Sequence, residues 1–143
     1  MIYIAAPFFN EEQIKRVGKV EYLLESLHLD YFSPRKESNL LFEKDKSTKG
    51  LPTFELNIKK IRKATKVIVI TNDKDTGTLF EAGFAFSLKK PIYYLYETTE
   101  KGSFNIMLAH SGVASTSIED LEEALQWPYE AIQKKRMEDL DVF

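Results

Sequence analysis

The sequence predicts an α/β fold in which helices cover both faces of a five-stranded parallel sheet. Short apolar runs alternate along the chain with longer segments whose apolar residues recur every three or four positions. The run at residues 67–70 consists of β-branched residues only, which is typical of a strand buried on both faces. The 143 residues, 43% hydrophobic and 29% charged, are expected to form a single domain spanning residues 1–143.

The first half of the chain is predicted to form three strands, two helices and one long loop. Asn10 followed by Gln13 is typical of a helix N-cap, and apolar residues at helical spacing continue from there as far as Leu27. The charged segment 35–50 is expected to be a surface loop. The strands cover residues 2–6, 29–33 and 67–70, and the second helix covers residues 53–63.

The second half continues the alternation with two strands and four helices. Ser117 followed by Asp120 is another predicted N-cap. Polar residues predict turns at 71–76 and around Gly102. The strands cover residues 91–96 and 113–115, and the helices cover residues 77–88, 105–110, 117–126 and a last piece from about 128 to 139.

Five strands connected in this way favour a flavodoxin-like, doubly wound strand order. Ligands of such sheets bind outside the carboxyl ends of the strands, at the switch point between the first and third strands. This rule selects two loops as the expected binding region, residues 7–10 and residues 72–76.

Composition excludes several classes of function. With 20 Lys and Arg against 22 Asp and Glu, the net charge of −2 argues against a nucleic-acid polymer or a membrane surface as partner. The chain has no Cys and only 2 His, so we expect neither a metal nor a cofactor. No apolar run approaches the roughly 18 residues of a membrane span, and no signal segment precedes the first strand, which favours the cytoplasm. The 13% aromatic residues suit a planar ligand or an oligomer.

Glu81 is the strongest candidate for a reactive group. It lies in a predicted helix that is apolar on nearly every side, so its carboxylate is expected to be partly buried. An unpaired buried carboxylate is costly and acquires a perturbed pKa or a specific partner. The carboxylate is therefore a candidate nucleophile or acid–base group, the alternative being an acid that stabilises the helix dipole.

Asp75 and Gly77 form the turn that leads into the same helix. The pattern is typical of an acidic N-cap and a glycine that permits close backbone approach, and plain capping is the alternative to a functional role. Because the turn belongs to one of the two selected loops, Asp75 is a candidate acceptor for a substrate hydroxyl.

Aromatic residues surround the other selected loop. Tyr3 lies on the first strand, either directed to the carboxyl edge of the sheet or simply buried in the core. Phe8 and Phe9 follow the strand and suit either a stacking wall for a base or anchoring in the core. His28 and His110 are interpreted as structural or surface residues, and no Walker A or G-x-G-x-x-G motif is present.

Four segments resemble the nucleoside 2-deoxyribosyltransferase family and its related branch, the 2′-deoxynucleoside 5′-monophosphate N-glycosidases. The resemblance runs from residue 1 to about residue 110, with the segments in the family's order and spacing. The segments are residues 1–10 (MIYIAAPFFN), 75–85 (DTGTLFEAGFA), 90–92 (KPI) and 105–107 (NIM).

The resemblance implies a role for each matched residue. Glu81 matches the nucleophile that takes up the deoxyribose, Tyr3 the tyrosine that orients it, and Asp75 the acid that holds sugar hydroxyls, a position at which the monophosphate-cleaving branch tends to have a small hydroxyl residue. Asn105 and Met107 match a motif that completes the site of a neighbouring subunit, which implies a dimer-based homo-oligomer. The small residues Ala82, Gly83 and Ala85 would permit close packing at such an interface. The remaining implied substrate-binding residues are Ala5, Phe8, Phe9 and Gly77.

Asn57 departs from the family pattern, because the corresponding position usually holds an Asp that protonates the leaving base. An amide donates a hydrogen bond but delivers no proton, and general acid catalysis is typically worth ~10²–10⁴-fold. Glu55, two residues away, is turned about 200° around a helix and is not expected to substitute. A slower transferase, a changed base preference and another glycosidic reaction are the three alternatives.

The expected activity is transfer of 2-deoxyribose between nucleobases through a covalent intermediate on Glu81, with small nucleosides and free bases as substrates. The alternatives are an N-glycoside hydrolase, in which water replaces the acceptor base, and a non-catalytic nucleoside- or nucleotide-binding module.

Overall fold

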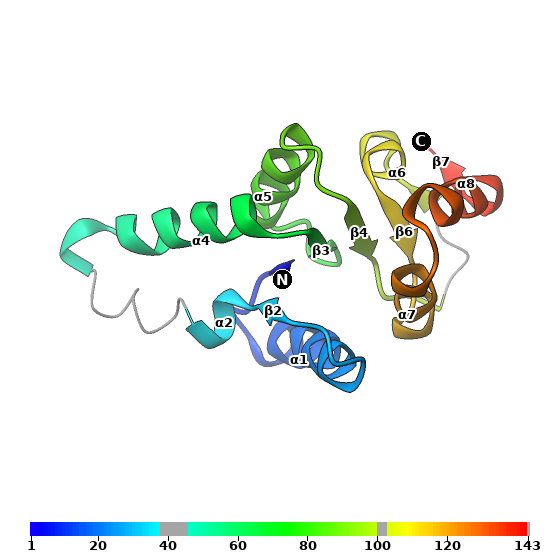
Figure 1. The fold of residues 1–143 in the computed structure, drawn as a ribbon. Helices are drawn as coiled ribbons and strands as arrows, with labels where there is room; N and C mark the ends of the chain where they lie inside the picture. Colours follow the sequence, from blue (N-terminus) through cyan, green and yellow to red (C-terminus); the bar gives the residue numbers. More distant parts are fainter. Residues whose placement is uncertain (38–45, 100–102, 143) are drawn as a thin grey trace.

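The computed structural model describes residues 1–37, 46–99 and 103–142, and its centre is a five-stranded parallel sheet (Figure 1). The order β2-β1-β3-β4-β6 confirms the predicted doubly wound arrangement, with the switch point between β1 and β3. Register places Tyr3 of β1 opposite Val67 of β3, and Val69 opposite Tyr94 of β4. The strands are β1 (Ile2–Ala5), β2 (Tyr31–Phe32), β3 (Lys66–Ile70), β4 (Ile92–Leu95) and β6 (Val113–Ser115).

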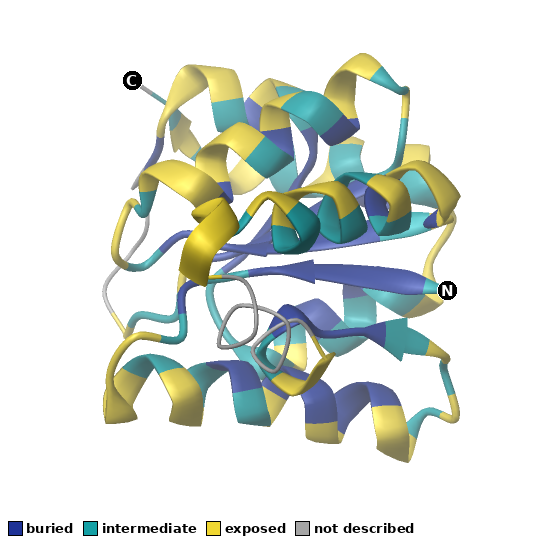
Figure 2. Ribbon diagram, turned by 90° about the vertical axis from the view of Figure 1, so that its left-hand side faces the viewer, coloured by how far each residue is buried: buried dark blue, intermediate teal, exposed yellow. Residues whose placement is uncertain are grey.

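Helices cover both faces of the sheet, and each face has its own apolar core. One face carries α1 (Glu11–Ser26) and α7 (Ile118–Gln126), and the other carries α4 (Leu51–Lys63), α5 (Thr76–Ser87) and α6 (Ile106–Ser111). The last helix, α8 (Tyr129–Asp139), packs beside β6. Figure 2 shows the buried strands between helices whose outer sides are exposed.

Alternation along β1 decides which core each side chain enters. Ile2 and Ile4 belong to the core under α1 and α7, whereas Tyr3 and Ala5 belong to the core under α4, α5 and α6. All four residues are buried, Tyr3 and Ala5 completely. This alternation directs the Tyr3 ring to the face of the sheet that α5 covers.

The helix caps that the sequence predicts are formed. The Asn10 side chain accepts a hydrogen bond from the backbone N–H of Gln13 at 2.9 Å, and Ser117 accepts one from Asp120 at 3.0 Å. The Gln13 carboxamide turns back to accept from the N–H of Phe9 at 2.8 Å, which ties the loop after β1 to the first turn of α1.

The structure corrects two segments. The predicted loop 35–50 includes part of a short helix, α2 (Pro34–Glu37), and a 3₁₀ turn at Lys46–Thr48, whereas residues 38–45 and the turn at Gly102 lie outside the described residues. A parallel pair of two-residue strands, β5 (Ser103–Phe104) and β7 (Asp141–Val142), was not expected, because strands of this length have no detectable periodicity. In the described part of the chain, no helix has both the length and the apolar character to cross a membrane.

Candidate active site

Tyr3 and Glu81 meet on the α5 face of the sheet, although 78 residues separate them in the sequence. The Tyr3 hydroxyl donates a hydrogen bond to Oε2 of Glu81. The Tyr3 ring is fully buried and stacks on Phe32 of β2, with 5.7 Å between ring centroids and 18° between planes. Tyr3 belongs to β1, its ring packs on Phe32 of β2, and Glu81 belongs to α5. Three elements of the fold therefore position the Tyr3–Glu81 pair.

The carboxylate of Glu81 has a perturbed pKa because it is largely removed from water. Its pKa is raised from an ordinary 4.5 to about 7. Desolvation is the largest cause, the hydrogen bond from Tyr3 lowers the pKa, and the charge of Asp75 raises it. Burial, and then the charge of Glu81, raise the pKa of the Tyr3 hydroxyl far above its usual range, so Tyr3 stays protonated and donates a hydrogen bond to the carboxylate. The predicted perturbed carboxylate is therefore present, with a neutral partner rather than a cation.

Asp75 caps α5 and contributes its charge to the site. Its Oδ2 accepts hydrogen bonds from the backbone N–H and the hydroxyl of Thr78, both at 2.9 Å. Gly77 is not required by the geometry, because a Cβ there would meet Oδ2 of Asp75 at 3.5 Å, an ordinary contact. The predicted capping role of Asp75 is confirmed, whereas the close backbone approach expected at Gly77 stays a prediction.

The loop after β1 presents two stacked aromatic rings. The centroids of Phe8 and Phe9 lie 5.8 Å apart with 18° between the planes. Phe9 is 77% exposed, so it is no anchor in the core, while Phe8 is half-buried. Ala5 ends β1, is completely buried and lies opposite Val69.

Asn57 lies on the side of α4 that faces α5. The spacing of Phe54, Asn57 and Ile61 places them on one helix face. The Phe54 ring lies 6.4 Å from that of Phe80, the residue before Glu81, and Ile61 is completely buried in the same core as Tyr3. Asn57 is half-buried, whereas Glu55 is exposed on another face of α4.

Asn105 and Met107 lie at the start of α6. Oδ1 of Asn105 accepts a hydrogen bond from the N–H of Met107 at 2.8 Å, and the Met107 side chain is 74% exposed. Within residues 1–37, 46–99 and 103–142, no hydrogen bond joins either residue to Tyr3, Asp75 or Glu81. These two side chains are thus directed to the surface of the chain rather than to its own Tyr3–Glu81 pair.

The exposed side of α5 differs from the expectation. Ala82 and Ala85 are buried against the chain's own sheet, so they are not available for packing at an interface, and only Gly83 is exposed. The exposed side instead carries large apolar residues, including Phe80 and Phe86 at 56% exposure each. Because α5 has apolar residues on nearly every side, the sequence predicted a buried helix. The sequence alone does not show which apolar side packs against the chain's own core and which side is exposed to solvent.

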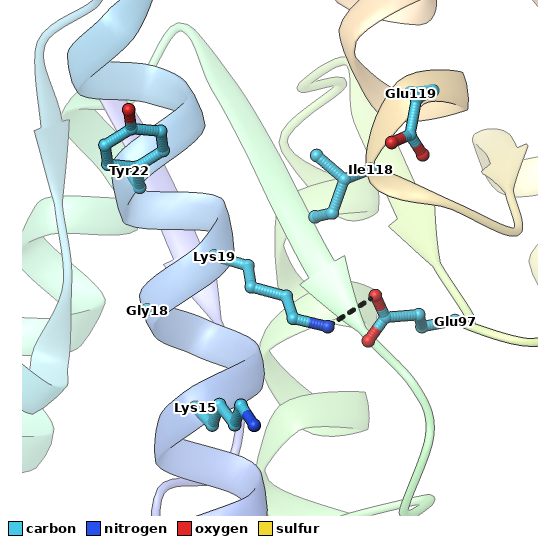
Figure 3. Close-up of a pocket in the computed structure, with 7 residues that line it drawn as sticks. All are labelled: Lys15, Gly18, Lys19, Tyr22, Glu97, Ile118 and Glu119. Atoms are coloured by element: carbon cyan, nitrogen blue, oxygen red, sulfur yellow. Dashed lines mark hydrogen bonds and ion pairs between the residues drawn. The ribbon is translucent and has the colours of Figure 1, made fainter.

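A groove of about 550 Å³ opens on the opposite face of the sheet, between α1 and α7 (Figure 3). A Lys19–Glu97 ion pair of 3.0 Å crosses it. Its lining residues are Lys15, Gly18, Lys19, Tyr22, Glu97, Ile118 and Glu119. The groove shares no residue with the Tyr3–Glu81 site, so its size is no guide to the chemistry. No cluster of three or more His, Asp or Glu side chains that could hold a metal occurs in the described residues.

Sequence reasoning missed the side chains that tie the loop after β3 in place. Asn72 pairs with the backbone of Glu97, and Arg16 of α1 contacts Asp73. Only the loop itself was selected by the switch-point rule. No signal in the sequence indicates that Arg16, 57 residues away from Asp73, is its partner.

The chain is similar to known proteins over most of its length. The family model described as nucleoside 2-deoxyribosyltransferase matches residues 2–125. A solved structure of a 2-deoxyribosyltransferase from the psychrotolerant bacterium Bacillus psychrosaccharolyticus is 32% identical, covers 92% of this chain and 94% of its own, and superposes with a TM-score of 0.69. No curated protein matches the sequence. The chain belongs to the nucleoside 2-deoxyribosyltransferase family.

Two more distant structures share the fold. A conserved protein from Enterococcus faecalis V583 is 17% identical, with coverage of 94% of this chain and 97% of its own and a TM-score of 0.61. A CMP N-glycosidase from Clostridium botulinum, BcmB, is 16% identical, with coverage of 88% and 98% and a TM-score of 0.57. These two likenesses show the fold alone. The family match over residues 2–125 and the 32% identical 2-deoxyribosyltransferase indicate that this chain is an enzyme of that general kind.

Proposed function

We propose that this protein transfers 2-deoxyribose between nucleobases through a covalent intermediate on Glu81. The observation that carries the proposal is the Tyr3–Glu81 pair: a desolvated carboxylate whose pKa is raised to about 7 and whose hydrogen-bond partner is a neutral phenol. Such a carboxylate is ionised in part at neutral pH and is weakly solvated, which are the properties of a carboxylate nucleophile.

The reaction is a double displacement. An oxygen of Glu81 forms a bond to C1′ of the deoxyribose as the bond from C1′ to the base nitrogen breaks, and the electron pair leaves with the base, which takes up a proton. A second base then forms a bond to C1′ and gives up a proton while the Glu81 oxygen leaves. Two inversions return the original β configuration. Because Tyr3 engages Oε2, it orients the carboxylate and leaves Oε1 as the attacking atom.

Asp75 favours a nucleoside over a nucleotide as substrate. Its carboxylate is close enough to Glu81 for its charge to raise the pKa of that group, so the two acidic side chains lie near each other. A 5′-phosphate near them would be repelled, whereas a sugar hydroxyl would donate a hydrogen bond to Asp75. The expected substrates are 2′-deoxyribonucleosides and free bases, with Phe8 and Phe9 as a stacking surface.

We assign Asn57 as the residue of α4 that contacts the leaving base. Its place between Phe54 and Ile61 supports this assignment over Glu55, which is exposed on another face. An amide at this position donates a hydrogen bond to the base, so we expect slow transfer or a base preference that differs from that of an acidic residue.

The site is completed, in our proposal, by a second copy of the chain. Met107 of α6 and Phe86 of α5 are large apolar side chains exposed at 74% and 56%. A homo-oligomer that covers them would bring Asn105 and Met107 to the partner's Glu81.

The decisive experiment is product analysis with deoxyinosine, with and without free adenine. Formation of deoxyadenosine supports transfer, and release of deoxyribose alone supports the N-glycoside hydrolase. Mass spectrometry after incubation with deoxyinosine alone should show one deoxyribosyl unit added to the wild-type protein and none to Glu81→Ala. A protein that binds the nucleoside without ever acquiring this adduct, and without turnover, would be the binding module instead.

A further inference from the structure

We propose that Arg16 is a positioning residue for the active site: it holds the loop after β3 in the conformation that presents Asp75. The proposal rests on the proposed function for its catalytic consequence, but not for its structural part. Arg16 lies on α1, on the opposite side of the sheet from Glu81, so it acts only through the loop that it contacts.

The guanidinium of Arg16 is surrounded by three carboxylates from three parts of the chain. Nη1 lies 3.4 Å from Asp73, Nη2 lies 3.2 Å from Glu12, and Nε lies 3.8 Å from Glu97. The side chain is only 13% exposed, whereas Glu12 is 81% exposed and Asp73 42%. Nε is buried and makes no hydrogen bond to the described residues. Withdrawing a guanidinium from water is costly unless charged groups compensate it, and here three carboxylates do so.

The two loops that Arg16 joins are also joined to each other. The Asn72 side chain donates to the carbonyl of Glu97 at 2.9 Å and accepts from its N–H at 3.0 Å. Lys19 adds a second cation to Glu97 at 3.0 Å. The loop after β3 is thereby tied to the loop after β4 by a neutral pair, and to α1 by charge.

The position of Asp73 constrains the position of Asp75, which lies two residues further along the chain. Between them Lys74 has a positive φ of 50°, and its N–H donates to the carbonyl of Thr71 at 3.1 Å, so the turn is tight. Asp75 then caps α5 through Thr78. A change at Asp73 therefore moves Asp75 rather than being absorbed by a flexible linker.

Loss of Arg16 leaves Asp73 and Glu97 in repulsion, with Lys19 as the remaining cation on Glu97. The loop is expected to open, and Asp75 then loses its fixed place for a sugar hydroxyl. Glu81 and Tyr3 keep their positions, because β1 and the middle of α5 hold them. The expected result is weaker substrate binding with an intact chemical step.

The first test measures the loop directly, without reference to activity. In Arg16→Met, amide hydrogen exchange of residues 72–78 should become roughly tenfold faster than in the wild type. Arg136→Met is the matched control, because Arg136 is 14% exposed, contacts Glu123 and bonds to β6 and α7 rather than to this loop. It should lower Tm while the exchange of residues 72–78 stays as in the wild type. Unchanged exchange in Arg16→Met would overturn the proposal.

The second test separates positioning from general stability. Arg16→Met should raise KM for a deoxynucleoside about fivefold to tenfold with kcat within about twofold, and Arg16→Lys should recover part of the loss. Asp73→Asn removes one of the three carboxylates around Arg16, so it should raise KM less than Arg16→Met does. The double variant should be no worse than Arg16→Met, since both changes break the Arg16–Asp73 ion pair. Additive effects, or a fall in kcat alone, would contradict the proposal.

The two tests also distinguish failure of this inference from failure of the proposed function. If the wild-type protein shows no transferase activity, the proposed function is wrong. The hydrogen-exchange measurement still tests the role of Arg16 in that case. Should Arg16→Met fail to fold, Arg16→Lys and Asp73→Asn carry the same comparison, because Asp73 is partly exposed and Lys keeps the charge.

Discussion

Glu21 of α1 is buried and Glu81 of α5 is half-buried, each near the middle of its helix and on opposite faces of the sheet, and their partners differ. Glu21 is 3% exposed and is paired with the Arg35 guanidinium, which donates to both of its carboxylate oxygens. Glu81 is paired with the neutral hydroxyl of Tyr3 and has the charge of Asp75 nearby. A cation neutralises the first carboxylate, whereas the second keeps an uncompensated charge.

In our proposal, this difference separates a structural carboxylate, Glu21, from a reactive one, Glu81. The Glu21–Arg35 ion pair joins α1 to α2 and therefore has a structural role. A carboxylate held by a phenol keeps both its affinity for a proton and an oxygen free to attack carbon. On the proposed role of Glu81, burial by itself does not distinguish a carboxylate nucleophile from a structural carboxylate, whereas the charge of its partner does.

The largest expected effect is on turnover. Glu81→Gln should lower kcat/KM by at least about 10³-fold, because an amide cannot form the covalent intermediate. Glu21→Gln is the matched control, and its activity per folded molecule should stay within about twofold of the wild type. Steady-state kinetics measure both, and comparable losses in the two variants would break the comparison.

The pH dependence of the rate tests the protonation state of Glu81. Only the ionised carboxylate attacks, so kcat/KM should fall about tenfold per pH unit below pH 7 and level off above it. Tyr3→Phe removes the hydrogen bond that lowers this pKa, so the acid limb should shift upward. A profile that is flat from pH 5 to pH 8 would show that no such group controls the reaction.

The group that protonates the leaving base is tested at α4. Asn57→Asp should raise kcat about tenfold or more, since a carboxyl delivers a proton where an amide cannot. Glu55→Gln is the control on the same helix and should have no effect. If kcat does not rise in Asn57→Asp and falls in Glu55→Gln, then Glu55 is the group that protonates the leaving base.

The smallest effects are on the free energy of unfolding, and they have opposite signs. Glu21→Gln should lower it by about 2 kcal/mol, because Arg35 loses its anion. The folded-state pKa of Glu81 is raised, so the native protein binds the extra proton between pH 4.5 and 7, and stability is lost as pH rises through that window. Glu81→Gln should therefore be more stable than the wild type at pH 8 by about 1–3 kcal/mol, with the gain vanishing below pH 4.5. Urea denaturation at both pH values measures this difference.

Much of the architecture followed from the residue pattern. The β-branched run in β3, the caps at Asn10 and Ser117, and the alternation of strands with helices predicted the parallel sheet and its order. These signals are local and strong, because burial on both faces selects β-branched residues and helix ends need side-chain acceptors. The prediction failed where elements are short, as in β5 and β7, and where a helix contains few residues, as in α2.

The sequence by itself determined that Glu81 lies in an apolar helix after the third strand of a parallel sheet, and that such a carboxylate would be perturbed. It did not determine which side of that helix is buried, so Ala82 and Ala85 were expected at an interface although they pack on the sheet. The family resemblance implied that Tyr3 orients Glu81, whereas only the tertiary structure decided that the Tyr3 hydroxyl donates to Oε2 and that the partner of Asp73 is Arg16. Periodicity assigns a side chain to a face of its own element, whereas contacts between residues far apart in the chain depend on how the elements are packed.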